Sequence, residues 1–213
     1  MDAYVKSSIE IDEFTINVME NKKYGHAGKV WEGGLLLSNF LTSQNARKRL
    51  KNKVVLEIGS GTGLCGIVAA LCGAKKVYLT DREEALHVIQ MNFEANKQAL
   101  INCEIVVVPL NWNNINDLAN IKDKIDVILG SEIIYHGINY KNIINTIDYF
   151  SDKNTDILMS YKHRTSSSCD FFNILDDNKI KWSVKVLSKD YLEENEIETV
   201  DDTCVFLLKN LIK

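Results

Sequence analysis

Short apolar runs alternate with longer segments of helical periodicity from residue 54 to the end of the chain. Runs rich in β-branched residues predict seven strands, at residues 54–59, 76–81, 104–110, 126–134, 156–162, 182–188 and 203–209. Apolar residues at helical spacing predict helices at residues 63–73, 82–97, 140–150 and 166–179. Because the strands are almost wholly apolar, we expect a parallel sheet that helices cover on both faces.

The two ends of the chain add further elements to the predicted sheet. No convincing helical pattern separates the last two predicted strands, so we expect them to form an antiparallel pair at one edge of the sheet. Near the start, residues 9–14 and 15–20 indicate a pair of strands, and residues 33–44 indicate a helix that leads into the sheet. The predicted fold is therefore α/β, with a Rossmann-like, doubly wound, mostly parallel seven-stranded sheet, an antiparallel edge pair and an N-terminal extension.

The chain shows no repeat, no low-complexity tract and no linker, and its 213 residues suit one well-cored domain. We therefore expect a single domain over residues 1–213, with an N-terminal extension at 1–50 and the core at 51–213.

Composition narrows the class of protein. A formal net charge of −4 argues against a general nucleic-acid binder, which needs a basic face. The first residues have no apolar signal segment, and the longest apolar run, LCGIVAALCGA, is too short to cross a bilayer. Five cysteines without C-x-x-C spacing suit a reducing compartment. We expect a soluble cytoplasmic protein, with access to the nucleus left open, that binds neither membranes nor nucleic acid.

A glycine-rich turn follows the first strand of the predicted sheet. The stretch VVLEIGSGTGLCG begins its glycine run at Gly59 and carries the pattern G-x-G-x-x-G from Gly61, through Gly63. A strand that ends in such a turn and opens a helix is a common nucleotide-binding device. Glu57, two residues before the run, would repel a pyrophosphate and attract an ammonium or a sulfonium. S-adenosylmethionine carries both cations and no phosphate.

A second carboxylate follows at the end of the next strand. Asp81 lies 20 residues past Gly61, where an acid can bind the two hydroxyls of a ribose. This feature suits NAD and S-adenosylmethionine equally, and Glu57 favours the sulfonium cofactor. A tight turn without a ligand and a solvated Asp81 are the alternatives.

The same residues carry a family resemblance. LEIGSGTGLCGIVAALCGAKKVYLTDREEAL resembles the cofactor-binding half of the seven-β-strand S-adenosylmethionine-dependent methyltransferases. GHAGKVWEGGLLLSNFL, PLNW and DVILGSEIIYH resemble, in order, segments of the methyltransferase-like protein lysine methyltransferases, whose known members modify chaperones and translation elongation factors. The resemblance extends from about residue 24 to the end of the chain.

The resemblance implies a set of cofactor contacts and a protein substrate. The matched contacts are Trp31, Gly59, Ser60, Gly61, Asp81, Trp112 and Ser131; the turn itself adds Glu57 and Gly63. Trp112 follows the third strand of the sheet, so its ring can lie against the adenine, with ordinary packing as the alternative. The implied cofactor is S-adenosyl-L-methionine, with S-adenosyl-L-homocysteine as its product.

The methyl acceptor should lie beside the carboxyl end of the fourth strand of the sheet. Enzymes that methylate planar amide nitrogens commonly carry Asn/Asp-Pro-Pro-aromatic there, whereas this chain has SEIIY at residues 131–135. We expect Glu132 to capture a lysine ammonium and Tyr135 to bound its channel, as the catalytic residues. The family position of Glu132 is usually Asp. The alternatives are an acid that caps a helix or meets solvent for Glu132, and simple packing for Tyr135.

Some questions stay open at this level. Residues that follow strand ends can line the substrate entrance or lie in solvated loops: His136, His163 and Arg164. His26 and His87 show no metal-ligand spacing, so no metal site is predicted. The alternatives to a lysine methyltransferase are a methyltransferase for another nucleophile (histidine, a terminal amine or a small molecule) and a catalytically lapsed partner subunit. An NAD-dependent oxidoreductase is disfavoured by Glu57.

Overall fold

The core of the protein is a seven-stranded sheet in the order β5-β4-β3-β6-β7-β9-β8. The computed structural model describes residues 4–135, 137–163, 168–177, 181–197, 199 and 202–212. The strands are β3 (Val54–Ile58), β4 (Lys76–Asp81), β5 (Glu104–Pro109), β6 (Val127–Ser131), β7 (Asp156–Lys162), β8 (Trp182–Val186) and β9 (Thr203–Asn210). Each falls within or overlaps a predicted strand. The predicted Rossmann-like fold is therefore confirmed.

Strand directions also follow the expectation. β5, β4, β3, β6 and β7 run parallel, whereas β9 is antiparallel to both β7 and β8. The expectation that no helix joins β8 and β9 was wrong, because helix α7 (Lys189–Glu194) lies between them. This helix is too short to show a helical period, but the Ser188 side chain caps it and Leu192 is buried.

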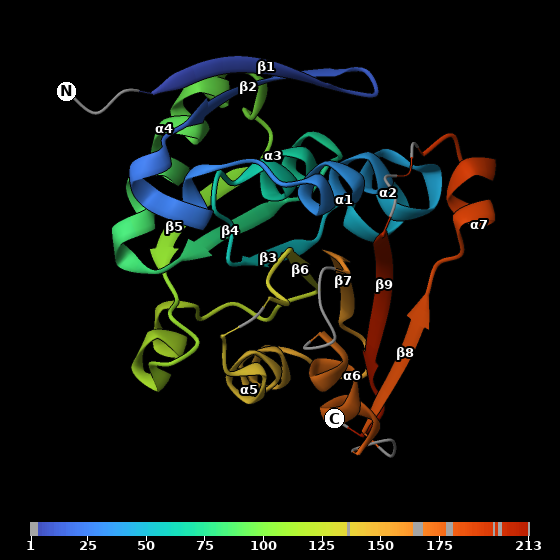
Figure 1. The fold of residues 1–213 in the computed structure, drawn as a ribbon. Helices are drawn as coiled ribbons and strands as arrows, with labels where there is room; N and C mark the ends of the chain where they lie inside the picture. Colours follow the sequence, from blue (N-terminus) through green and yellow to red (C-terminus); the bar gives the residue numbers. More distant parts are fainter. Residues whose placement is uncertain are drawn as a thin grey trace.

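Helices cover both faces of the sheet (Figure 1). One hydrophobic cluster joins the sheet to α1 (Glu32–Thr42), α2 (Gln44–Leu50) and α3 (Leu64–Leu71), and a second joins it to α5 (Tyr140–Phe150) and α6 (Ser168–Asp176). The predicted helix at 33–44 corresponds to α1. Ser43 then interrupts the helical backbone and caps α2, which the sequence pattern missed. Within the described residues, no helix has the length and apolar character needed to span a membrane.

The N-terminal strands form a separate hairpin of β1 (Val5–Ile11) and β2 (Phe14–Glu20). The predicted pair of strands is confirmed, but the first strand starts earlier than predicted and the turn falls at residues 12–13, inside the predicted span of 9–14. Helix α4 (Leu86–Asn96) holds this hairpin through two asparagines. Asn92 accepts from the N–H of Met19 at 2.6 Å and donates to its carbonyl at 3.1 Å. Asn96 pairs with Asn17 in the same way. The side-chain amides of Asn92 and Asn96 thus form with β2 the hydrogen bonds that a neighbouring strand would otherwise form, because buried backbone groups need partners.

The hairpin leads into the remaining part of the N-terminal segment. After β2, the short helix η1 (Lys22–Gly28) carries the chain toward the carboxyl edge of the sheet, and residues 29–31 connect it to α1. The N–H of Asn21 donates to the carbonyl of Gly28 at 2.8 Å, and the N–H of Val30 donates to Glu20 Oε1 at 2.7 Å. The division into an extension at 1–50 and a core at 51–213 stays a prediction.

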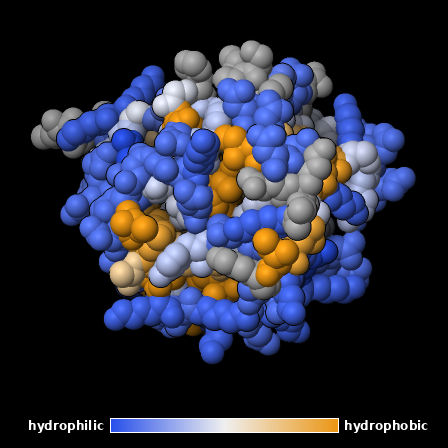
Figure 2. Space-filling model, turned by 90° about the horizontal axis from the view of Figure 1, so that it is seen from below, coloured by the Kyte–Doolittle hydropathy of each residue, from blue (hydrophilic) through white to orange (hydrophobic). Residues whose placement is uncertain are grey.

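Three further 3₁₀ turns lie between the main elements: η2 (Glu83–Ala85), η3 (Lys97–Ala99) and η4 (Ile115–Asn120). The face of the molecule that lies at the bottom of Figure 1 is mostly hydrophilic, and its apolar side chains form separate patches (Figure 2). Scattered apolar residues of this kind are usual on protein surfaces.

Candidate active site

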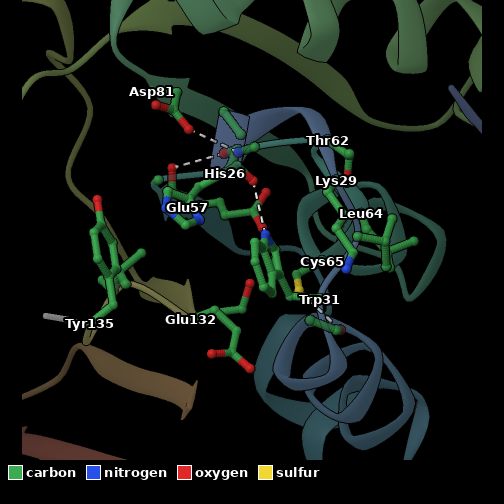
Figure 3. Close-up of a pocket in the computed structure, with 18 of the residues that line it drawn as sticks. His26, Lys29, Trp31, Glu57, Thr62, Leu64, Cys65, Asp81, Glu132 and Tyr135 are labelled. Atoms are coloured by element: carbon green, nitrogen blue, oxygen red, sulfur yellow. Dashed lines mark hydrogen bonds between the residues drawn. The ribbon is translucent and has the colours of Figure 1, made fainter. Parts of the chain in front are cut away.

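A cavity of about 190 Å³ lies at the carboxyl ends of β3, β4 and β6 (Figure 3). It brings together residues that the sequence predicted from distant segments: Trp31, Glu57, Gly59, Ser60, Gly61, Asp81, Trp112, Ser131, Glu132 and Tyr135. Gly63 is the one predicted site residue that does not line it. Ligands of open α/β sheets bind at this edge, so the fold places the cavity where a cofactor site is expected.

The glycine-rich turn forms the wall beneath α3. Gly59 and Gly61 have φ angles of +65° and +54°, which favour glycine. A Cβ on Gly59 would lie 2.7 Å from Ile133 Cγ2, so the turn also requires a residue without a side chain. Gly63 has a φ of +80° and forms the N-cap of α3. It supports the turn from the helix side rather than from the cavity.

Asp81 connects the end of β4 to this turn. Its carboxylate accepts a hydrogen bond from the N–H of Gly61 at 2.9 Å through Oδ2, and one from the N–H of Arg82 at 2.8 Å through Oδ1. Only 8% of the residue is exposed, and burial raises the pKa of its carboxyl group. Each carboxylate oxygen has a second lone pair. Asp81 can therefore hold the turn and still accept hydrogen bonds from ribose hydroxyls.

Glu57 is buried in the wall of the cavity, with 1% of its surface exposed. Its Oε2 accepts from the N–H of Gly66 at 3.0 Å, and a Cβ on Gly66 would lie 2.7 Å from that oxygen. Burial raises the pKa of Glu57 to about 8. A positively charged ligand in the cavity would favour the ionised carboxylate, as the sequence analysis expected of a sulfonium.

Aromatic rings form another part of the cavity lining. The ring of His26 lies between those of Trp31 and Tyr135, with centroid distances of 5.4 and 5.6 Å (Figure 3). Trp31 Nε1 donates to the carbonyl of His26 at 2.9 Å, which fixes the indole at the mouth. Trp112 lies against the glycine turn, 3.2 Å from where a Cβ on Gly59 would be. This position suits contact with a planar base.

Glu132 follows β6 with a φ of +56°. Its Oε1 accepts from the N–H of Gly33, in the first turn of α1, at 2.9 Å. Its Oε2 accepts from the N–H of Lys162 at 3.4 Å. The geometry thus shows the helix-capping alternative, while the same residue lines the cavity. Capture of a substrate lysine by Glu132 stays a prediction.

Sequence reasoning missed part of the lining. The additional residues are His26, Ala27, Lys29, Val30, Gly34, Thr62, Leu64, Cys65, Arg82 and Ile133. Those between 26 and 34 lie inside a segment that the resemblance had already marked. Of the predicted entrance residues, His163 is exposed and does not line this cavity. His136 and Arg164 lie outside the described residues.

The lining fits S-adenosylmethionine. A glycine-rich backbone turn, the buried carboxyl groups of Asp81 and Glu57, and the ring of Trp112 meet in one cavity, and these groups could contact a ribose, a cation and a planar base. In the ranges that the structure covers, no group of three metal-ligating side chains could hold a metal ion.

Comparisons with known proteins point to one family. The family described as Lysine methyltransferase matches residues 10–178. A mouse protein named Protein N-lysine methyltransferase METTL21A is 32% identical over 164 residues, covering 76% of this chain and 73% of that protein. EEF1A lysine methyltransferase 3 of Xenopus tropicalis is 35% identical over 140 residues, covering 66% of this chain and 59% of that protein.

Solved structures support the fold. The Thermus thermophilus 16S rRNA N2 G1207 methyltransferase, solved with S-adenosylmethionine and guanosine, has a TM-score of 0.66 at 15% identity, covering 97% of this chain and 50% of that one. The ribosomal protein L11 methylase of Lactobacillus delbrueckii has a TM-score of 0.52 at 16% identity, covering 83% and 76%. The chain thus spans half to three quarters of these structures. Together with the site, the comparisons show that this chain belongs to the lysine methyltransferase family and is an S-adenosylmethionine-dependent methyltransferase.

Proposed function

We propose that the lysine this enzyme methylates belongs to a protein of the translation or chaperone machinery, and that Glu132 and Tyr135 receive its side chain. The relative named for EEF1A supports a translation factor as the substrate. The resemblance described above supports a chaperone as the other class. The observation that carries the site assignment is that both residues follow β6 and line the same cavity as the glycine turn.

The cavity divides into a cofactor side and an acceptor side. On the cofactor side, Asp81 would bind the ribose, Trp112 would contact the adenine, and Glu57 would face the cationic part. S-adenosylmethionine, when bound, supplies an activated methyl group. On the acceptor side, the carboxylate of Glu132 would attract and orient the lysine ammonium. Burial raises the pKa of Tyr135, so its phenol stays protonated and can donate a hydrogen bond.

The cellular setting is part of the same proposal. We place the enzyme in the cytoplasm, where translation factors and many chaperones act. Cys65 and Cys72 are buried free thiols, which suits a reducing compartment. The acidic net charge of −4 supports a protein partner rather than nucleic acid.

Ligand binding and methyl transfer test this proposal separately. In a thermal-shift assay, S-adenosylmethionine and S-adenosylhomocysteine should stabilise the protein, by about 2.7 kcal/mol at 100 times the dissociation constant, whereas NAD and ATP should not. With radiolabelled S-adenosylmethionine, label should enter purified elongation factor 1A or a purified chaperone, and hydrolysis should release methylated lysine. Label found only in histidine, a terminal amine or small molecules would contradict the proposal.

A further inference from the structure

A histidine that the family assignment does not use lines the cavity mouth. His26 belongs to η1, which lies over the cavity between β2 and α1. Its ring is exposed to solvent on one side and held between Trp31 and Tyr135 on the others. Figure 3 shows His26 between Trp31 and Tyr135, and all three line the same cavity as Glu132. The imidazole therefore lies beside Tyr135, which the proposed function places on the acceptor side.

The imidazole is also available to a ligand. In the part of the chain that the structure describes, no hydrogen bond occupies either ring nitrogen of His26; its carbonyl alone accepts, from Trp31 Nε1 at 2.9 Å. Since the imidazole is partly solvated, a proton that it takes up can leave to water. Imidazoles change protonation state within the physiological pH range, which suits repeated uptake and release of protons.

Two carboxylates of the cavity are engaged by the backbone. Both oxygens of Glu132 accept from N–H groups, those of Gly33 and Lys162. Both oxygens of Asp81 do the same, with Gly61 and Arg82. A proton taken up by either acid would weaken contacts that hold the α1 terminus or the glycine turn.

Glu57 and Tyr135 are not open proton acceptors either. The Oε2 of Glu57 already accepts from the N–H of Gly66 at 3.0 Å, and with the cofactor bound its charge would face the sulfonium. Burial raises the pKa of Tyr135, so its phenol keeps its proton. Among the cavity groups of the described residues, the imidazole of His26 can take a proton without giving up a contact that holds the backbone.

We propose that His26 is the proton acceptor for the substrate lysine. A lysine ammonium cannot attack a methyl group, because its nitrogen has no free electron pair, and its ordinary pKa is about 10.4. One N–H bond of the ammonium breaks, and the proton forms a bond with the neutral imidazole, directly or through one water. The freed electron pair then forms the new N–CH₃ bond while the C–S bond breaks and its electron pair stays on sulfur. The imidazolium returns its proton to solvent.

Titratable and charged groups of both signs lie on the elements around His26. They are Lys22, Lys23, Tyr24 and Lys29 from its own segment, Glu32 at the start of α1, Glu57 from β3, Asp81 and Arg82 at the end of β4, Glu83 and Glu84 of η2, His87 of α4, and Glu132 and Tyr135 after β6. Glu132, which lines the same cavity, holds the ammonium. The inference rests on the proposed lysine activity.

The test compares His26→Phe and His26→Asn with the wild-type enzyme on the protein that the wild type labels. His26→Phe keeps an aromatic ring between Trp31 and Tyr135 and removes the base. With saturating S-adenosylmethionine, we expect turnover of both variants to fall about 100-fold near pH 7. The loss should shrink above about pH 9.5, where lysine loses its proton unaided. Added imidazole should partly restore turnover of His26→Ala.

His87 provides a matched control. It is an exposed imidazole that contacts the rings of Tyr4 and Tyr24, with centroid distances of 6.2 and 6.3 Å, and it does not line the cavity. His87→Phe should methylate at the wild-type rate. All variants should bind S-adenosylhomocysteine with wild-type affinity in calorimetry, because His26 lies on the acceptor side.

A second measurement is independent of turnover. In the complex with S-adenosylhomocysteine, n-butylamine serves as a mimic of the lysine side chain, and we expect it to shift the NMR ring signals of His26 and not those of His87. Methylation of lysine by the wild-type enzyme is established first. If the wild type does not methylate lysine, the proposed function fails; if the wild type does and the His26 variants behave like it, only the role of His26 fails. Full turnover of His26→Phe near pH 7, or a loss by the same factor at every pH, would overturn the role of His26.

Discussion

The carboxylate of Glu132 accepts a hydrogen bond from the backbone N–H of Gly33 at 2.9 Å, across 99 positions of sequence. A Cβ on Gly33 would lie 2.6 Å from the same oxygen, so the approach requires glycine there. The first turn of α1 carries a partial positive charge that favours an acid. The end of β6 and the start of α1 are therefore joined at the cavity.

Substitutions at Glu132 should separate capture of the substrate from binding of the cofactor. Glu132→Gln keeps an acceptor for Gly33 and removes the charge, so the KM for the protein substrate should rise by roughly tenfold or more. S-adenosylhomocysteine affinity should be unchanged in calorimetry. Glu132→Asp has a shorter reach and should lose about 1–3 kcal/mol of unfolding free energy as the Gly33 contact breaks. A Glu132→Gln enzyme with wild-type kinetics would reduce Glu132 to a helix cap.

Asp81 should affect both the cofactor and the fold. Asp81→Ala should weaken S-adenosylmethionine binding by about 1.5–3 kcal/mol, the range for a hydrogen bond to a charged group. Because Gly61 and Arg82 donate to this carboxylate, the same change should also lower the free energy of unfolding by about 1–3 kcal/mol. Calorimetry and urea unfolding measure the two effects. Unchanged cofactor affinity in a folded Asp81→Ala protein would refute the ribose contact.

Alanine substitutions at two glycines should distinguish backbone strain from lost space. Gly59 and Gly73 both have positive φ angles, +65° and +97°. Both variants should lose about 1 kcal/mol from strain. Gly59→Ala adds a contact of 2.7 Å with Ile133, so it should lose a further 1–3 kcal/mol or so and bind cofactor weakly. Urea unfolding measures the free energy of unfolding of the two variants. Equal losses would show that the structure around Gly59 can relax to accept a methyl group.

Glu57 should make stability depend on pH. Burial raises its pKa from 4.5 to about 8, so the folded state holds more protons than the unfolded state between these values. The stabilisation by protonated Glu57 is fully present below pH 4.5 and is lost as the pH rises through about 8. Unfolding free energy should therefore fall across this window. Glu57→Gln should flatten the fall, as urea unfolding at several pH values can measure; equal slopes would contradict the assignment.

The affinity for the cofactor should also depend on the ionisation of Glu57. A sulfonium favours ionised Glu57, so the affinity for S-adenosylmethionine should rise with pH toward about 8, by no more than about tenfold per pH unit. S-adenosylhomocysteine has no sulfonium and serves as the matched ligand. Its affinity should change less in the same calorimetric series. Parallel changes for the two ligands would show that Glu57 does not face the sulfur.

Local patterns were sufficient for the strands, most helices and the glycine turn. Apolar runs with period and length typical of buried strands marked β3 to β9, and glycines marked the turn after β3, because both signals arise from neighbouring residues. The short helices α2 and α7 were missed. Each is too short for a helical period, and each depends on a serine cap, Ser43 and Ser188, whose effect is visible only in the folded backbone.

For this protein, the sequence by itself determined the fold, the cofactor and the edge of the sheet where they meet, since parallel strands bring their carboxyl ends together whatever the packing details. Tertiary structure alone decided what the side chains do there. It paired Glu132 with Gly33, joined Asp81 to Gly61, and set His26 between Trp31 and Tyr135. Gly33 and Gly61 lie at least 20 positions from the acids that they contact, and Tyr135 is equally remote from His26; only Trp31 is a near neighbour in the sequence. Packing of whole elements therefore decides these contacts, and no local sequence pattern records them.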